Sequence, residues 1–153
     1  MQINVTKRDG GLQKFDLDKV HKVLEWATID ITGVSQSEIE LKSNIQLYDK
    51  IPAYDIHELI IKSSAELISE HTPNYQFVAA RLISYKIRKE VYGQYDPWHI
   101  KKLIKVNSKR GVYDKKILKH FTDEEFDTIN SYIKHDRDDT FTYAGMEQFR
   151  GKY

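Results

Sequence analysis

The chain has 153 residues, 40% of them hydrophobic and 31% charged, a length that suits one domain or one small domain with the start of another. It contains no cysteine, which excludes disulfides, thiolate metal sites and cysteine-based catalysis. No apolar stretch approaches the roughly 18 residues that span a bilayer, and the first residues lack the apolar core of a secretory signal. We therefore expect a cytoplasmic protein without a membrane partner.

The formal net charge of +1 conceals an uneven distribution. Residues 81–110 carry nine Lys and Arg against two Asp and Glu, a net charge of +7, whereas residues 1–80 and 111–153 have net charges of −4 and −2. A basic segment of this kind can bind nucleic acid, a nucleotide or an acidic neighbouring surface. Its pattern does not select among the three.

Two short runs of alternating apolar residues, 3–5 and 12–15, flank Asp9-Gly10 and predict a β-hairpin. Lys7 and Arg8 are adjacent cations at its turn. Two neighbouring positive charges there suit a polyanion, most simply a nucleotide phosphate. The other interpretation is an ordinary solvated turn with surface charges, which these residues by themselves favour.

Four helices are predicted after the hairpin. Asp16 is a natural N-cap for the first helix, whose apolar face carries Val20, Val23, Leu24 and Ala27. Ser37 is a natural N-cap for a short second helix. Asp55 and Glu58, three residues apart, are typical of a capping box that begins the third. The fourth and longest runs from about residue 74 to residue 92 and ends at a glycine.

The remaining segments complete the predicted fold. Residues 47–52 have little regular pattern but can form a third short strand. Residues 94–153 show the spacing of further helices, one of which begins at a predicted capping box of Thr122 and Glu125. We therefore expect a mainly α (α+β) protein. Residues 1–93 form a small β-hairpin or three-stranded sheet on four helices, and residues 94–153 form a further helical segment that lacks part of its partner surface.

Two further residues are candidates for anion binding. Lys89 falls within the apolar arc of the fourth helix, where a lysine either extends past the rim to solvent or faces a buried anion. Lys86 shares that arc, which favours the first interpretation. His57 lies in the first turn of the predicted third helix, where backbone N–H groups attract phosphate, or it simply packs on that turn. The six histidines show no metal-site spacing, and the chain has no glycine-rich phosphate loop.

Taken together, four segments resemble the ATP-cone, the allosteric nucleotide-binding module of many ribonucleotide reductase large subunits: Val5-Thr6-Lys7-Arg8-Asp9-Gly10, Leu17-Asp18-Lys19-Val20, Asp55-Ile56-His57-Glu58 and Arg88-Lys89-x-x-Tyr92-Gly93. The segments 75–82, 92–95 and 134–144 are similar to the aerobic class I large subunit of the enterobacterial and T-even-phage kind. The resemblance covers essentially all 153 residues. It implies a small sheet that caps a four-helix bundle, with a nucleotide between the sheet and the helix ends.

The resemblance also implies which residues bind the nucleotide. Lys7, Arg8 and Lys89 would approach the triphosphate, and His57 would lie near the sugar and phosphates, with Asp55 coupling the nucleotide to the response. The adenine and ribose would lie among Gln13, Lys14, Phe15, Asp16, Leu17, Asp18 and Lys19. Two positions depart from the family pattern, because Gln13 replaces an acidic residue and Ala53 replaces a hydroxyl residue, so Ala53 can contribute only its backbone. Mg²⁺ would accompany the triphosphate.

By the same resemblance, ATP permits activity and dATP inhibits it by changing subunit assembly. The implied partners are the remainder of the large subunit, the small radical-generating β subunit and, in an inhibited state, further copies in an oligomer. The chain lacks the cysteines of the catalytic barrel, so we expect no catalytic residues and no activity from it alone. The alternatives are a nucleic-acid-binding module or a protein-interaction module that uses the basic residues 81–110. The aromatic residues of that segment do not form a recognisable base-stacking platform.

Overall fold

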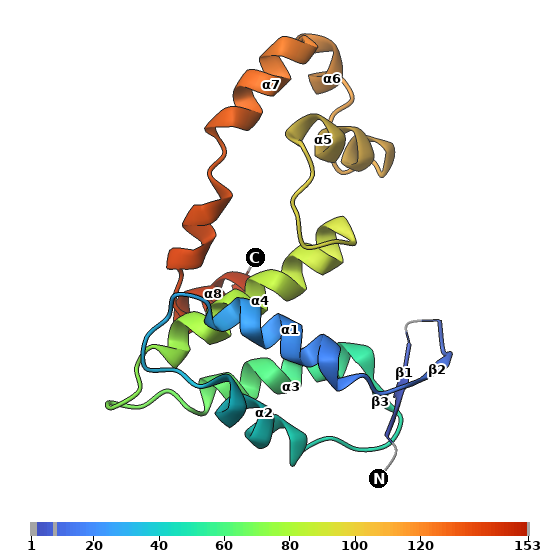
Figure 1. Ribbon diagram of the computed structural model, residues 1–153. Coiled ribbons are helices and arrows are strands. Elements are labelled where there is room, and N and C mark those ends of the chain that lie inside the picture. Colours follow the sequence, from blue (N-terminus) through green and yellow to red (C-terminus); the bar gives the residue numbers. More distant parts are fainter. Residues whose placement is uncertain (1–2, 8, 153) are drawn as a thin grey trace. The chain divides into compact units, whose positions relative to one another are not determined.

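The computed structural model describes residues 3–7 and 9–152, which are mainly helical with one small sheet (Figure 1). The chain divides into two compact units, Met1–Ile87 with Asp138–Tyr153, and Arg88–Arg137. The predicted fold class, mainly α with a small three-stranded sheet, is confirmed. The predicted domain boundary at residue 93 stays a prediction.

The sheet of the first unit has strand order β2-β1-β3. Its strands are β1 (Asn4–Thr6), β2 (Leu12–Lys14) and β3 (Ile51–Pro52). β1 pairs with β2 as an antiparallel hairpin and with β3 in parallel, so Val5 lies opposite both Gln13 and Ile51. The predicted hairpin and the third strand are both confirmed. In Figure 1 the sheet lies at the end of the helices where α1 and α3 begin.

The described residues of the first unit also form five α-helices, of which α4 continues into the second unit. They are α1 (Leu17–Thr28), α2 (Gln36–Asn44), α3 (Ala53–Ala65), α4 (Tyr75–Tyr92) and α8 (Tyr143–Lys152). The four helices predicted in residues 1–93 are confirmed, and α8 joins the same unit from 50 residues further along the chain. α1 begins as predicted, because the Asp16 carboxylate accepts a hydrogen bond from the Asp18 N–H at 3.1 Å.

Two predicted helix starts are wrong. The N-cap of α2 is Ser35, whose hydroxyl accepts from the Glu38 N–H at 3.4 Å, and Ser37 lies inside the helix. α3 begins at Ala53, two residues before the predicted cap, and no side chain caps it. Pairing of β3 with β1 fixes the backbone up to Pro52, so the helix starts directly after that residue.

The core of the first unit is apolar and continuous. Leu24 and Ala27 of α1 are fully buried, and Val20 and Val23 pack against the same cluster, which confirms the predicted apolar face of that helix. The other buried members are Ile39, Ile60, Ile61, Tyr75, Val78, Ala80, Leu82, Ile83 and Met146. Met146 places α8 in this core together with α1, α2, α3 and α4.

A cluster of four charges lies beside this core. Lys86 is only 6% exposed and forms an ion pair with Glu58, so the prediction that it extends to solvent is wrong. Its ammonium group lies 3.5 Å from the ring centroid of Tyr54. Arg150 of α8 donates to Glu58 at 2.8 Å and also pairs with Glu147. Each charge therefore has an opposite charge in contact.

These contacts shift the titration of Glu58 and Lys86. Partial burial raises the pKa of Glu58, but hydrogen bonds and charge from Lys86 and Arg150 outweigh it and leave this pKa below its ordinary value. Burial lowers the pKa of Lys86, yet its contacts with Glu58 and Tyr54 leave that pKa above the usual range. Both groups are therefore held in their charged forms at neutral pH.

The second unit is helical within its described residues. It contains α5 (Ile100–Lys109), α6 (Ile117–His120) and α7 (Asp123–Tyr132), and a 3-10 helix, η1 (His135–Thr140), begins at its end. The capping box predicted at the start of α7 is present, because Thr122 and Glu125 each accept from the backbone N–H of the other. Phe126 of α7 is buried, with its ring centroid 5.7 Å from that of Phe121.

Replacing the true cap of α2 should destabilise the protein. We expect Ser35→Ala to lower the free energy of unfolding by about 1 kcal/mol, because an orphan N–H of the first turn loses its acceptor. Thermal or urea unfolding measures this loss. The matched control is Ser37→Ala, an exposed position inside the same helix, for which we expect a change within about 0.5 kcal/mol. Equal losses in the two variants would contradict the assignment.

Stability should depend on pH through Glu58. Because the pKa of Glu58 in the folded state lies below its ordinary value of 4.5, its ionised form stabilises the fold above that pH. The contribution is lost as the pH falls through the folded-state pKa. Thermal unfolding between pH 3 and 7 should therefore show a shallower acid-side decline for Glu58→Gln than for the natural chain. Parallel profiles for the two proteins would show that Glu58 is not stabilised as an anion.

Candidate nucleotide site

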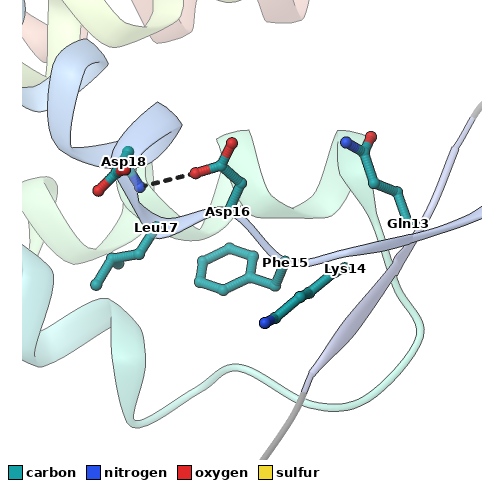
Figure 2. Close-up of a pocket in the computed structure, with 6 residues that line it drawn as sticks. All are labelled: Gln13, Lys14, Phe15, Asp16, Leu17 and Asp18. Atoms are coloured by element: carbon teal, nitrogen blue, oxygen red, sulfur yellow. Dashed lines mark hydrogen bonds between the residues drawn. The ribbon is translucent and has the colours of Figure 1, made fainter.

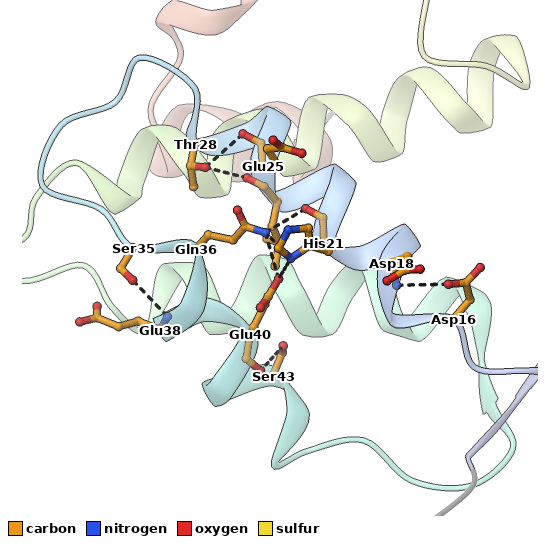
Figure 3. Close-up of polar contacts among 11 residues, drawn as sticks. Asp16, Asp18, His21, Glu25, Thr28, Ser35, Gln36, Glu38, Glu40 and Ser43 are labelled. Carbon is orange, nitrogen blue, oxygen red and sulfur yellow. Dashed lines mark hydrogen bonds and ion pairs between the residues drawn. The ribbon is translucent and has the colours of Figure 1, made fainter.

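An open pocket of about 410 Å³ lies where the chain passes from the sheet into α1 (Figure 2). β2 ends at Lys14 and α1 begins at Leu17, so two residues turn the backbone from strand to helix. The lining residues are Gln13, Lys14, Phe15, Asp16, Leu17 and Asp18. Six of the seven residues predicted around the base and ribose therefore line one pocket, while their contact with a ligand stays a prediction.

The lining combines an apolar surface with charged groups. Figure 2 shows Phe15, Leu17 and the Lys14 side chain on one side of the chain, with Gln13 and Asp16 directed to the other. Phe15 is half-buried, which leaves ring surface that can pack against a flat aromatic ligand. The carboxylates and the Gln13 amide can accept hydrogen bonds from amino or hydroxyl groups. This chemistry suits a base and a sugar better than a phosphate chain.

Lys19, the seventh predicted residue, is not one of the lining residues. Its ammonium group lies 3.8 Å from the Asp16 carboxylate, and both side chains are exposed. An exposed pair of this kind adds little to stability. Lys19 directly follows the lining residue Asp18 in the first turn of α1, so it can contribute positive charge beside the pocket.

The hairpin turn presents Lys7 to solvent. The Lys7 N–H donates to the Gly11 carbonyl at 2.8 Å, and the Gly10 N–H donates back to the Lys7 carbonyl at 3.0 Å. The Asp9 carboxylate accepts from the Gly11 N–H at 2.9 Å, which closes the turn. Gly10 has a φ of 81°, in the left-handed region that glycine adopts without strain. Arg8, the second predicted cation, lies outside the described residues.

The start of α3 lies in the same sheet region. Ala53 follows Pro52 of β3 directly, and Pro52 is paired with Thr6 of β1. Asp16, Ser35 and Thr122 cap their helices with a side chain, whereas α3 receives no such bond. Among the described residues, no side chain accepts from the N–H groups of its first turn, and the dipole of the helix favours an anion there.

His57 lies deeper in α3 than the sequence predicted. Since the helix begins at Ala53, His57 belongs to the second turn, not the first. Its ring stacks on Tyr85 of α4, with centroids 5.6 Å apart and an interplanar angle of 29°. The ring of Tyr85 in turn packs against that of Trp26 of α1, with their centroids 5.9 Å apart. Burial raises the pKa of the Tyr85 hydroxyl, so this ring stays neutral.

Tyr85 and Trp26 thus support a predicted site residue, although neither was predicted to do so. Tyr85 falls on the apolar arc of α4, which indicated a core position. The spacing could not show that its ring meets His57, because that contact joins two helices. Asp55 lies two residues before His57 and is half-buried.

Two further predictions concern Lys89 and a bound metal ion. Lys89 is in the last turn of α4 and belongs to the second compact unit. Within residues 3–7 and 9–152, no group of three or more His, Asp and Glu side chains is arranged to hold a metal ion.

Comparison with known families identifies the family of this chain. The family model of the ATP cone domain matches residues 3–90, more than half of the chain. The chain belongs to the ATP-cone family. Membership implies that this ATP-cone binds a nucleotide effector, in agreement with the pocket at the start of α1 and the uncapped start of α3.

The chain is also similar to large enzyme subunits. It is 47% identical, over 97% of its length, to ribonucleoside-diphosphate reductase 1 subunit alpha of Salmonella typhimurium and to that of Escherichia coli. It is 42% identical, over 99% of its length, to ribonucleoside-diphosphate reductase subunit alpha of Enterobacteria phage T4. The ATP-cone chain spans about a fifth of the length of these relatives. Among the described residues, no helix is long and apolar enough to cross a membrane.

The glycine at the hairpin turn can be tested directly. We expect Gly10→Ala to lower the free energy of unfolding by about 1–2 kcal/mol, because alanine is strained at a φ of 81°. Thermal unfolding measures this loss. Gly151→Ala in α8 is the control, because the added methyl group meets nothing within 4 Å and φ is not positive there. It should be neutral or slightly stabilising, and a comparable loss in both variants would rule out turn strain as the cause.

Proposed function

We propose that this ATP-cone is the activity-regulating domain of a ribonucleoside-diphosphate reductase large subunit and binds ATP or dATP. The pocket of Gln13–Asp18 carries this proposal, because it joins an aromatic ring to hydrogen-bonding groups at the end of the strand that pairs with β1. The identity to reductase alpha subunits supports the same assignment.

The elements around the pocket divide naturally between the parts of a nucleotide. The base and the ribose occupy this pocket, where the Phe15 ring offers a stacking surface and the polar lining residues offer hydrogen-bonding groups. The phosphates extend toward Lys7 and the first turn of α3, where a cation and a helix dipole both favour negative charge. His57, Asp55, Arg8 and Lys89 complete the proposed set on the strength of the family resemblance.

Mg²⁺ enters this scheme with the triphosphate. Mg²⁺ usually keeps several waters and binds through substrate phosphates with one or two carboxylates. The described residues provide no metal cluster, so the phosphate oxygens of the bound nucleotide would supply its main ligands.

ATP activates and dATP inhibits in the proposed mechanism. The two effectors differ by one hydroxyl group, so each must favour a different state through its contacts near the ribose. Gln13 and Ala53 lie on two elements of the sheet region and are the positions expected to set this preference. The states would differ in how the large subunit assembles with the small β subunit and with its own copies in the cytoplasm.

The nucleic-acid alternative finds less support in the second unit. The rings of Trp98 and Tyr92 pack with their centroids 5.7 Å apart, and the Lys102 ammonium lies 4.3 Å from the centroid of the Trp98 ring. The Arg88 guanidinium lies 4.9 Å from the Tyr95 ring. These rings are engaged within the chain, whereas base stacking needs exposed aromatic faces.

Calorimetric titration tests the proposal. We expect ATP and dATP, each with Mg²⁺, to bind the natural chain, and Lys7→Ala to weaken both by about tenfold or more, because a charge-assisted hydrogen bond to phosphate contributes about 1.5–3 kcal/mol. Lys62→Ala removes an exposed cation from the same unit and should leave affinity unchanged. Absence of binding of either nucleotide at millimolar concentration would overturn the proposed function.

A further inference from the structure

The cluster of Glu58, Lys86, Glu147 and Arg150 joins three helices that are distant in sequence. Glu58 belongs to α3, Lys86 to α4, and the other two residues to α8. Arg150 reaches Glu58 through two hydrogen bonds, Nη1 to Oε1 at 2.8 Å and Nη2 to Oε2 at 3.3 Å, and a paired geometry of this kind orients both side chains. The Arg150 Nε also donates to Glu147 at 3.1 Å.

Burial makes this cluster sensitive to any change in its geometry. The side chain of Lys86 is 8% exposed, and those of Glu58 and Arg150 are 35% and 26% exposed. Two positive and two negative charges balance within it. Loss of the Glu58 contact would leave the buried Lys86 ammonium without its ion-pair partner, so the position of Glu58 matters most for that pair.

A second contact holds α8 to the same unit. Met146 is 6% exposed and belongs to the core cluster, and Tyr143 packs against that cluster. Thr142 caps the helix, since its hydroxyl accepts from the Gly145 N–H at 3.3 Å. α8 is therefore fixed by apolar packing in its first half and by Arg150 near its end.

Glu58 directly follows His57 and lies about one helical turn beyond Asp55, two of the proposed effector contacts of α3. Asp55 and Glu58 are three residues apart, and Tyr54 and Glu58 are four apart, so these side chains neighbour one another along the helix. The Tyr54 ring lies beneath the same Lys86 ammonium that pairs with Glu58. A shift or rotation of the first turn of α3 must therefore disturb the charge cluster.

We propose that Glu58 is the junction through which an effector at the start of α3 acts on α8, with Arg150 as the positioning residue on the receiving helix. This inference rests on the proposed function only for the presence of the effector. An effector that draws the first turn of α3 toward its phosphates moves Glu58, and Arg150 carries that movement to α8. α8 is accordingly a part of the regulatory unit, although the ATP-cone family match ends at residue 90.

Hydrogen–deuterium exchange on the full chain tests the junction. The variants are Arg150→Gln, Arg150→Lys and the matched control Lys152→Gln, which removes an exposed cation from the same helix. Without nucleotide, we expect Arg150→Gln to raise the exchange rate of the α8 amides about tenfold, Lys152→Gln to leave it unchanged, and Arg150→Lys to restore much of the protection. Equal exchange in Arg150→Gln and Lys152→Gln would overturn the proposal.

Exchange measured with bound nucleotide shows whether Arg150 transmits the effect of the nucleotide to α8 or only stabilises α8. In the natural chain, Mg-ATP or Mg-dATP should change exchange in α8 at least threefold. In Arg150→Gln this response should disappear while nucleotide affinity, measured by calorimetry, stays within about threefold of the natural value. An α8 that does not respond in a chain that binds nucleotide would overturn the junction. Absence of binding would overturn the proposed function and the effector role, and the comparison without nucleotide would still decide whether Arg150 holds α8.

Discussion

The proposed site depends on the double pairing of β1. This strand of three residues pairs with β2 on one side and β3 on the other, so it ties the hairpin turn, the pocket strand and the start of α3 into one sheet. Side-chain contacts reinforce the pairing with β3, because Asn4 donates to Asp49 at 2.9 Å and Thr6 donates to the Lys50 carbonyl at 2.9 Å. Lys50 is held at a φ of 64°, which a lysine adopts only where surrounding contacts require it.

The helices then face two separate requirements. Their apolar faces close a core around Leu24 and Ile60, which fixes their packing and the side of each helix that faces inward. On α3, two directional contacts add to this constraint, namely the stacking of His57 on Tyr85 and the pairing of Glu58 with Lys86. α3 therefore carries both the proposed effector contacts and the contacts that report its position.

Local signals in the sequence predicted local structure well. Asp16 at the start of α1, the capping box before α7 and the hairpin at Asp9-Gly10 were all confirmed, because each depends on residues within a few positions of one another. The predicted start of α3 was wrong because the pairing of β3 with β1, near the beginning of the chain, sets it. The prediction that Lys86 extends to solvent was wrong for the same reason, since its partner Glu58 lies 28 residues away in sequence. The pocket residues were predicted from resemblance, and their common location follows from their being consecutive.

The error at α3 has a functional meaning. A capping box at Asp55 and Glu58 would have satisfied the first N–H groups of the helix and left less for a ligand. The observed start leaves that turn without a side-chain cap and releases Glu58 to form the charge cluster. Allosteric coupling typically amounts to about 1–3 kcal/mol, the range of one or two charge-assisted hydrogen bonds. A few contacts that engage this turn therefore suffice to bias α3, provided that the helix moves as a rigid body and the cluster transmits the movement.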